Sequence, residues 1–112
     1  MQDKDLLSEQ DVLAIDITHA NGEVVLVLQG EIDIVSAQHL RESVEGACEL
    51  SVPVVLDMAS VTFMDSSGIS ALIKACALDT GIARPVSIRN PSEPVRRLLT
   101  ITGLDTVFGI ES

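Results

Sequence analysis

Aromatic and basic residues are both scarce in this sequence. Its 112 residues include two phenylalanines, no tryptophan and no tyrosine, so it lacks the aromatic platforms on which single-stranded nucleic acids stack. It has 7 Lys and Arg against 17 Asp and Glu, for a formal net charge of −10. Binding to a phosphate backbone or an anionic membrane requires clustered cations. We therefore expect no direct nucleic-acid or membrane partner, and a basic protein surface as the favoured partner.

Cysteine, histidine and long apolar runs are also rare. Cys48 and Cys76 form no CxxC pattern and are interpreted as small, reduced core residues. His19 and His39 show no ligand spacing, which argues against a zinc site. No stretch approaches the ~20 apolar residues of a membrane span, and the acidic start has no signal-peptide run. The sequence thus predicts a cytoplasmic protein.

Aliphatic residues are abundant and supply the predicted core. Hydrophobic residues make up 46% of the chain, enough for a single domain over residues 1–112, with polar residues 1–10 as a flexible lead-in. The run at 23–30 is nearly all apolar, which predicts a strand covered on both faces. The periodicity predicts, in order, strands at 12–18 and 23–30, a helix from 36 to about 50, a strand at 53–58, a helix at 69–78, a strand at 85–88, a helix at 93–101 and an edge strand at 106–110.

The predicted fold class is α/β: a mixed β-sheet of four to five strands with helices packed on it, in the order β-β-α-β-α-β-α-(β). Asn21-Gly22 predicts a hairpin turn between the first two strands. Ser36 is the expected N-cap of the first helix, and Gly81 and Gly103 are expected to end the second and third. Strands joined through helices run mostly parallel, and the loops beyond their C-terminal ends form the functional edge of such sheets.

One polar stretch, Asp65-Ser66-Ser67-Gly68, lies between a buried strand and an amphipathic helix. The start of a helix has unpaired N–H groups and a positive dipole end, which together favour anions. We predict that the loop from Ala59 to Ser67 and the loop from Glu31 to Ser36 share the functional edge. This arrangement would bring Asp33 near Ser66.

Two neighbours of this stretch suggest a contact surface. Phe63-Met64 places two large apolar residues in a predicted surface loop, as in a docking patch. Gly68 lacks a side chain, which would leave room for another chain to approach closely.

Ser66 has three interpretations from the residues alone: a nucleophile, a helix cap or a modified site. A hydrolase elbow, G-x-S-x-G, requires glycine at position 64, where this chain has Met64, and neither His19 nor His39 is an obvious base. A serine between a strand and a helix is most often a cap. The flanking apolar residues favour a site.

Carboxylates offer further chemical alternatives. Glu31 and Asp33 are two residues apart and fit either a pair of catalytic carboxylates or a solvated loop, which is common in an acidic chain. Asp33, Asp57 and Asp65 are suitable ligand types for magnesium, but their spacing does not specify a metal site. No phosphate-binding glycine motif is present, so no nucleotide cofactor is expected.

Three segments of the chain, in order, resemble the STAS domain family, and within it the small stand-alone anti-sigma factor antagonists of bacteria. Leu28–Asp33 is similar to the family pattern L-x-G-E-[LI]-D. Val55–Met58 followed by Val61–Gly68 resembles the strand and DSSG signature. Leu98–Leu104 followed by Phe108–Ile110 resembles the closing motif.

The resemblance implies a non-enzymatic phosphorylation switch. The unphosphorylated form would bind an anti-sigma factor that is also a serine kinase, and so free a sigma factor. Phosphorylation of the first DSSG serine, Ser66, would release the kinase, and a PP2C-type phosphatase would reset the protein. The resemblance also implies a set of partner-binding residues around Ser66: Asp33, Ile34, Val35, Asp65, Ser67, Gly68 and Ile69.

Charge gives a physical basis for such a switch. A phosphate adds about −1.5 to −2 charges, which a helix N-terminus tolerates, whereas a docked partner would have to bury them beside acidic neighbours. The switch would then act at the interface and leave the fold intact. The alternative is a STAS scaffold subunit of a transport or stress-sensing complex that does not switch.

Overall fold

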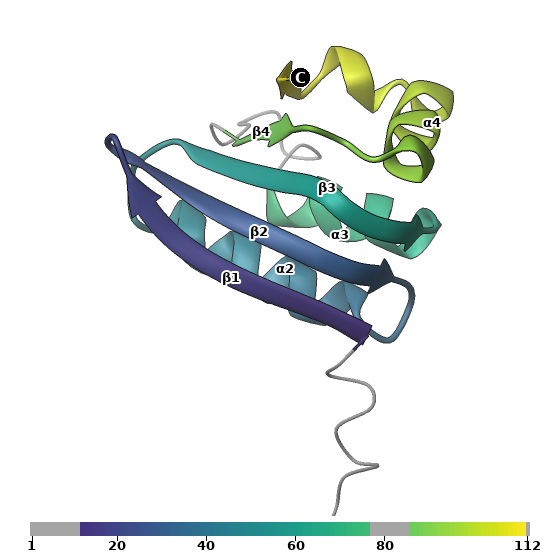
Figure 1. The fold of residues 1–112 in the computed structure, drawn as a ribbon, viewed down its shortest axis with the longest axis horizontal. Coiled ribbons are helices and arrows are strands. Elements are labelled where there is room, and N and C mark those ends of the chain that lie inside the picture. The colour runs from purple at the N-terminus through teal and green to yellow at the C-terminus, as the bar shows by residue number, and fades with distance from the viewer. Residues whose placement is uncertain (1–11, 77–85, 112) are drawn as a thin grey trace, which may run out of the picture.

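The computed structural model describes residues 12–76 and 86–111 (Figure 1). Its strands and α-helices follow the predicted order, but the terminal strand lies at 109–111 instead of 106–110 and follows a short 3-10 helix that was not predicted. They are β1 (Leu13–Ala20), β2 (Glu23–Ile32), α2 (Ala37–Cys48), β3 (Val54–Met64), α3 (Ser66–Ala75), β4 (Val86–Arg89), α4 (Glu93–Thr102), the short 3-10 helix η3 (Leu104–Thr106) and β5 (Gly109–Glu111).

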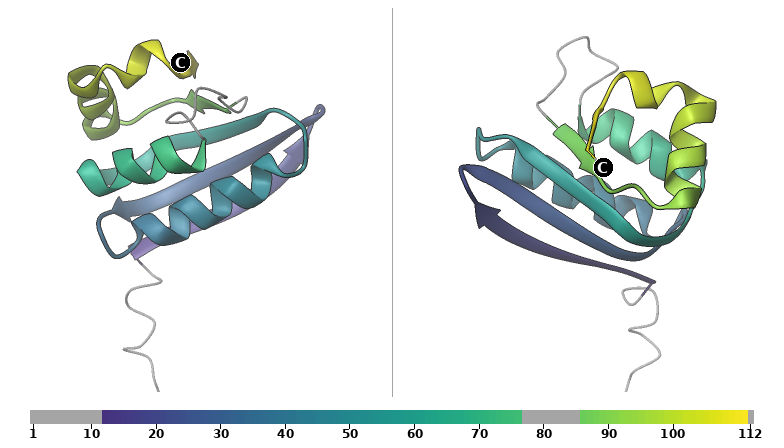
Figure 2. Two further views of the ribbon diagram at one scale, coloured as in Figure 1. Left: turned by 180° about the vertical axis from the view of Figure 1, so that it is seen from behind. Right: turned by 45° about the horizontal axis from the view of Figure 1, so that its top comes forward.

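The strands form one mixed sheet in the order β1-β2-β3-β4-β5. β1 is antiparallel to β2, and the other neighbouring pairs are parallel. α2 and α3 lie side by side on one face of this sheet (Figure 2). The predicted fold class is therefore confirmed.

The hairpin between β1 and β2 forms at the predicted turn. Asn21 and Gly22 both have positive φ, at 55° and 79°, as a two-residue turn of this kind requires. Ala20 and Glu23 are register partners across it. Local turn chemistry thus sets the register of the antiparallel edge.

The expectation that β2 is covered on both faces holds only for its first half. Val24, Leu26 and Leu28 alternate along the strand and are fully buried. On the opposite face, Val25 is also buried, at 8% exposed, Val27 is half-buried and Gln29 is exposed. The helices therefore cover one face of β2, and its apolar run does not require a layer on the other face.

Polar contacts cross the sheet on strands β2, β4 and β5. Arg89 on β4 pairs with Glu23 on β2 at 3.1 Å and with Glu111 on β5 at 3.0 Å. The Asn90 N–H also donates to the Glu111 carbonyl at 2.6 Å. These contacts attach the C-terminal strand to the middle of the sheet.

The loop predicted from Ala59 to Ser67 is mostly strand. β3 continues to Met64 and contains one extra residue at each of two register shifts opposite β2. The buried residues Met58, Val61 and Met64 are consequently three apart instead of two. The bulges remove the period-two signal, which is why the sequence pattern ended this strand at Met58.

The helix bounds also differ from the predictions. α3 begins at Ser66 instead of Ile69 and ends at Ala75 with Cys76 as its C-cap; the predicted stop at Gly81 lies outside the described residues. α4 ends at Gly103, in the left-handed conformation, as predicted. In the described ranges, no helix has the length and apolar character needed to cross a membrane.

Candidate functional site

Two strand-to-helix junctions meet at one edge of the sheet. Ile32 ends β2, Met64 ends β3, and the two are register partners on parallel strands. Asp33 and Asp65 therefore follow at the same edge. The Asp65 N–H donates to the Ile32 carbonyl at 3.2 Å, which ties the two junctions together directly.

Asp65, and not Ser66, caps α3. Asp65 is extended, with φ −116° and ψ −170°, and its carboxylate accepts from the Ser67 N–H at 2.8 Å. Ser66 is the first helical residue and is exposed. Within 12–76 and 86–111, no residue hydrogen-bonds to the Ser66 hydroxyl. The cap interpretation of Ser66 is wrong, and its hydroxyl is open to solvent.

The loop between β2 and α2 is closed by Asp33 and Ser36. The Asp33 carboxylate accepts from the N–H groups of Val35 and Ser36, each at 3.0 Å. These donors, the Ser36 N–H foremost, lower the pKa of the Asp33 carboxyl below its ordinary value, against an opposing effect of burial. Ser36 occupies the predicted N-cap position of α2, but its side chain makes no capping bond there.

The predicted partner-binding residues divide by exposure. Ile34 is 79% exposed and Val35 is 51% exposed, while Asp33, Asp65 and Ser67 are half-buried. All five lie at the edge that carries Ser66. They form the part of the predicted set that a partner can reach.

Gly68 and Ile69 are buried instead. A Cβ on Gly68 would lie 2.8 Å from side-chain atoms of both Ile32 and Met64. The missing side chain therefore lets α3 pack on the strand ends and does not make room for another protein. Gly68 and Ile69 can therefore contribute to a docking surface only by packing beneath its exposed residues.

Of the two apolar residues expected at the surface, Phe63 and Met64, only Phe63 is exposed. Phe63 is 46% exposed, but Met64 is only 6% exposed and packs in the core. Phe63 is the register partner of Glu31, so it lies next to the edge that carries Ser66. One large apolar side chain remains on the surface there.

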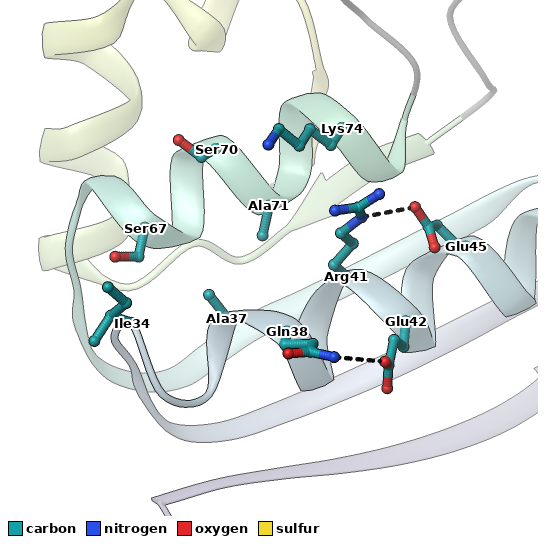
Figure 3. A pocket seen from close by; sticks show the side chains of 10 residues that line it. All are labelled: Ile34, Ala37, Gln38, Arg41, Glu42, Glu45, Ser67, Ser70, Ala71 and Lys74. Carbon is teal, nitrogen blue, oxygen red and sulfur yellow. Dashed lines mark hydrogen bonds and ion pairs between the residues drawn. The ribbon is translucent and has the colours of Figure 1, made fainter.

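A groove of about 570 Å³ lies between α2 and α3 (Figure 3). Ile34 and Ser67 lie at its end nearest Ser66, and Lys74 lies further along α3. Arg41 pairs with Glu45 across one turn of α2 at 2.9 Å. In the described part of the chain, Lys74 makes no ion pair, so its charge remains available at the groove.

Ser70 and Lys74 of α3 line the groove beside the predicted residue Ser67, but neither was predicted as a site residue. Ser67, Ser70 and Lys74 lie at i, i+3 and i+7, which places them on one side of a helix. That spacing is visible in the sequence. What was not visible is that this stripe faces α2 across a groove.

The described residues do not bring together the side chains that a metal site or a serine hydrolase would need. Among residues 12–76 and 86–111, no three His, Cys, Asp or Glu side chains come together as a metal site. Asp33, Asp57 and Asp65 therefore do not form a cluster. His39 is exposed on α2 and makes no hydrogen bond to Ser66.

Comparison with known proteins identifies the family. The STAS domain matches residues 14–112. The chain is 26% identical over 98 residues to the anti-sigma-B factor antagonist of Bacillus subtilis, covering 88% of this chain and 90% of that protein. It is 27% identical over 107 residues to the anti-sigma-F factor antagonist RsfB of Mycobacterium tuberculosis, covering 95% and 87%.

Solved structures show the same fold. An anti-sigma factor antagonist from Mycobacterium paratuberculosis superposes with a TM-score of 0.77 at 26% identity, covering 90% of this chain and 86% of that one. The antagonist SpoIIAA in its unphosphorylated form superposes with a TM-score of 0.68 at 22% identity, covering 88% and 89%. SpoIIAA of Bacillus in its phosphorylated form gives 0.64 at the same identity, covering 88% and 92%. The chain described here belongs to the STAS domain family.

Proposed function

We propose that this protein is an anti-sigma factor antagonist switched by phosphorylation of Ser66. Its unphosphorylated form binds an anti-sigma factor that is also a serine kinase, and a sigma factor is thereby freed. The kinase then phosphorylates Ser66 with its own Mg-ATP and lets go. A PP2C-type phosphatase removes the phosphate and returns the protein to its binding form.

The accessible hydroxyl of Ser66 carries this proposal. Asp65 caps α3, so phosphorylation of Ser66 would break no hydrogen bond of its hydroxyl to the described residues. It lies at the first position of α3, where the free N–H groups and the helix dipole accommodate an anion at a gain of about 0.3–1 kcal/mol. The fold therefore tolerates the modified state.

The same position makes the phosphate costly in a complex. A partner covering Ser66 would also cover Asp65, whose carboxylate adds like charge. Burying an unpaired charge costs several kcal/mol, and about 4 kcal/mol corresponds to a thousandfold in affinity. The modification thus acts on the complex and leaves the free protein folded.

The relatives support this proposal. Several are named as anti-sigma factor antagonists, and SpoIIAA, which shares the fold, is known in an unphosphorylated and a phosphorylated form. This protein has a serine at a sheet edge of the same architecture. We therefore assign the switch to protein–protein contact and not to an enzymatic activity of this chain.

Phosphopeptide mapping tests the proposal. The protein is used to pull down its partner from the source cells, and the recovered kinase is incubated with the protein and ATP. We expect a single phosphate on Ser66 by mass spectrometry, none on the Ser66→Ala variant, and an unchanged yield on Ser70→Ala. A kinase partner that leaves Ser66 unmodified would disprove the switch, and a transport or sensing complex in the pull-down would favour the scaffold alternative.

A further inference from the structure

Among the polar residues of the described ranges, Ser36 is the one whose whole residue is buried, at 3% exposed. We propose that Ser36 is a positioning residue that, together with Asp33, holds Ile34 and Val35 in a fixed exposed position beside Ser66. The partner then meets a preformed surface. This inference rests on the proposed function, because the loop needs a fixed shape only if a partner docks on it.

The hydrogen bonds of Ser36 run into the loop and not into the helix that follows it. The Ser36 hydroxyl donates to the Glu31 carbonyl at 2.9 Å and accepts from the Asp33 N–H at 3.0 Å. The Asp33 carboxylate oxygen lies 3.2 Å from the same hydroxyl. One buried side chain thus joins the end of β2 to both ends of the loop.

Asp33 completes the closure from the other side. Its carboxylate accepts from the N–H groups of Val35 and Ser36, and its carbonyl accepts from the Ala37 N–H at 2.8 Å. Every residue from Asp33 to Ser36 except Ile34 therefore has its N–H group bonded within this loop. We call these contacts of Asp33 and Ser36 the clasp.

The clasp orders a loop whose exposed side chains have little packing of their own. Ile34 and Val35 are 79% and 51% exposed, so burial contributes little to ordering them. Binding a partner through a mobile loop loses affinity, because the loop side chains must be ordered when the complex forms. A loop that is already ordered avoids most of this cost.

The clasp is also connected to the phosphoacceptor. The Asp65 N–H donates to the Ile32 carbonyl, which lies within the segment that the clasp spans. Ile34 and Ser67 then line the same end of the groove. The position of the apolar loop is therefore set relative to the helix that carries Ser66.

A purely structural role for Ser36 makes a different prediction. If Ser36 served only to start α2, its loss would lower stability and leave the binding of the folded protein unchanged. Its side chain makes no capping bond to α2. The geometry therefore points to the loop as the part that Ser36 controls.

The test compares Ser36→Ala with Ser43→Ala, a half-buried serine of α2 that does not line the groove. Amide hydrogen exchange is measured on the free proteins, and KM and kcat for Ser66 phosphorylation are measured with the kinase recovered by pull-down. For Ser36→Ala we expect about tenfold faster exchange at Val35 and at the substituted position, and a KM raised about tenfold with kcat within about twofold. Ser43→Ala should match the wild type in each measurement.

Asp33→Asn provides a second variant in case Ser36→Ala folds poorly. Asparagine keeps an oxygen that accepts from the Val35 and Ser36 N–H groups, so it should retain most of the protection and raise KM less than Asp33→Ala does. Equal KM values for Asp33→Asn and Asp33→Ala would overturn the proposal.

Two other results would overturn the inference while the proposed function stands. One is an unchanged exchange rate at Val35 in Ser36→Ala; the other is faster exchange with an unchanged KM. Failure of the proposed function is recognised separately, because the wild-type protein itself would then not be phosphorylated on Ser66. In that case the inference falls with it.

Discussion

The two strand-to-helix junctions beside Ser66 begin in the same way but differ in length. Each begins with an aspartate directly after a strand, and each aspartate accepts hydrogen bonds from N–H groups two residues ahead or further along. After Asp65 the helix starts at once, at Ser66. After Asp33 three residues intervene before α2 starts at Ala37.

The difference decides what each junction presents. The short junction leaves a polar hydroxyl exposed on the first turn of a helix, where a negative charge is tolerated. The longer one presents two aliphatic side chains, Ile34 and Val35, which are exposed at 79% and 51%. We infer that the short junction carries the phosphorylation switch and that the longer junction supplies the contact surface for the partner.

A charge placed at the short junction should have the largest effect. We expect Ser66→Asp to weaken the complex with the anti-sigma factor kinase about a thousandfold, while Ser66→Ala keeps wild-type affinity. Ser60→Asp adds the same charge at an exposed position of β3 and serves as the control. Isothermal titration calorimetry measures all three. Equal affinities of Ser66→Asp and Ser66→Ala would contradict the charge argument.

The packing under the short junction should show the next largest effect. Gly68→Ala places a Cβ within 2.8 Å of Ile32 and Met64, which costs about 1–3 kcal/mol of stability. Gly46→Ala is the matched control on α2, where nothing lies within 4 Å of the added Cβ. It should gain about 0.5–1 kcal/mol, because alanine favours a helix over glycine. Urea denaturation measures the stability of both variants. A gain in stability for both would show that Ile32 and Met64 can move aside at little cost.

Removing the cap of α3 should have a smaller effect on stability. Asp65→Ala loses the bond to the Ser67 N–H, at a cost of about 1 kcal/mol, whereas Asp65→Asn keeps an acceptor and should cost only a few tenths. The two variants are compared by thermal unfolding. If alanine and asparagine were equivalent there, the hydrogen bond would not be the reason why α3 starts at Ser66.

Much of this edge could be predicted from the sequence, since the signals involved are local. Asn21-Gly22 specifies a hairpin by its turn chemistry, and the order of strands and helices follows from periodicity. Parallel strands then place Asp33 and Asp65 at one edge. These steps require no knowledge of how side chains pack.

Other features could not be predicted, because they depend on pairing between distant segments. The bulges in β3 arise opposite β2 and remove the alternation that would have marked the strand. Asp65 and Ser66 are both good N-cap residues, so the choice between them depends on where β3 ends. The groove exists only because α2 and α3 pack side by side.

Low pH should destabilise the loop between β2 and α2, and we expect this to be the smallest of the predicted effects. The pKa of Asp33 is lowered in the folded protein, chiefly by the Ser36 N–H. A carboxyl of this kind contributes stability above its unfolded pKa and loses it as the pH falls through the lowered folded value.

We therefore compare the urea midpoints of the wild type and Asp33→Asn between about pH 5 and about pH 2, a range that extends below the ordinary aspartate pKa. The difference between the two midpoints should shrink as the pH falls. The amide of this variant keeps the acceptor oxygen but does not titrate, so general acid effects cancel in the comparison. The carbon shift of the Asp33 carboxyl, followed by NMR over the same range, identifies the group. A difference that stays constant with pH would mean that the ionised form of Asp33 adds nothing to the loop, whose closure would then rest on Ser36 and the neutral hydrogen bonds alone.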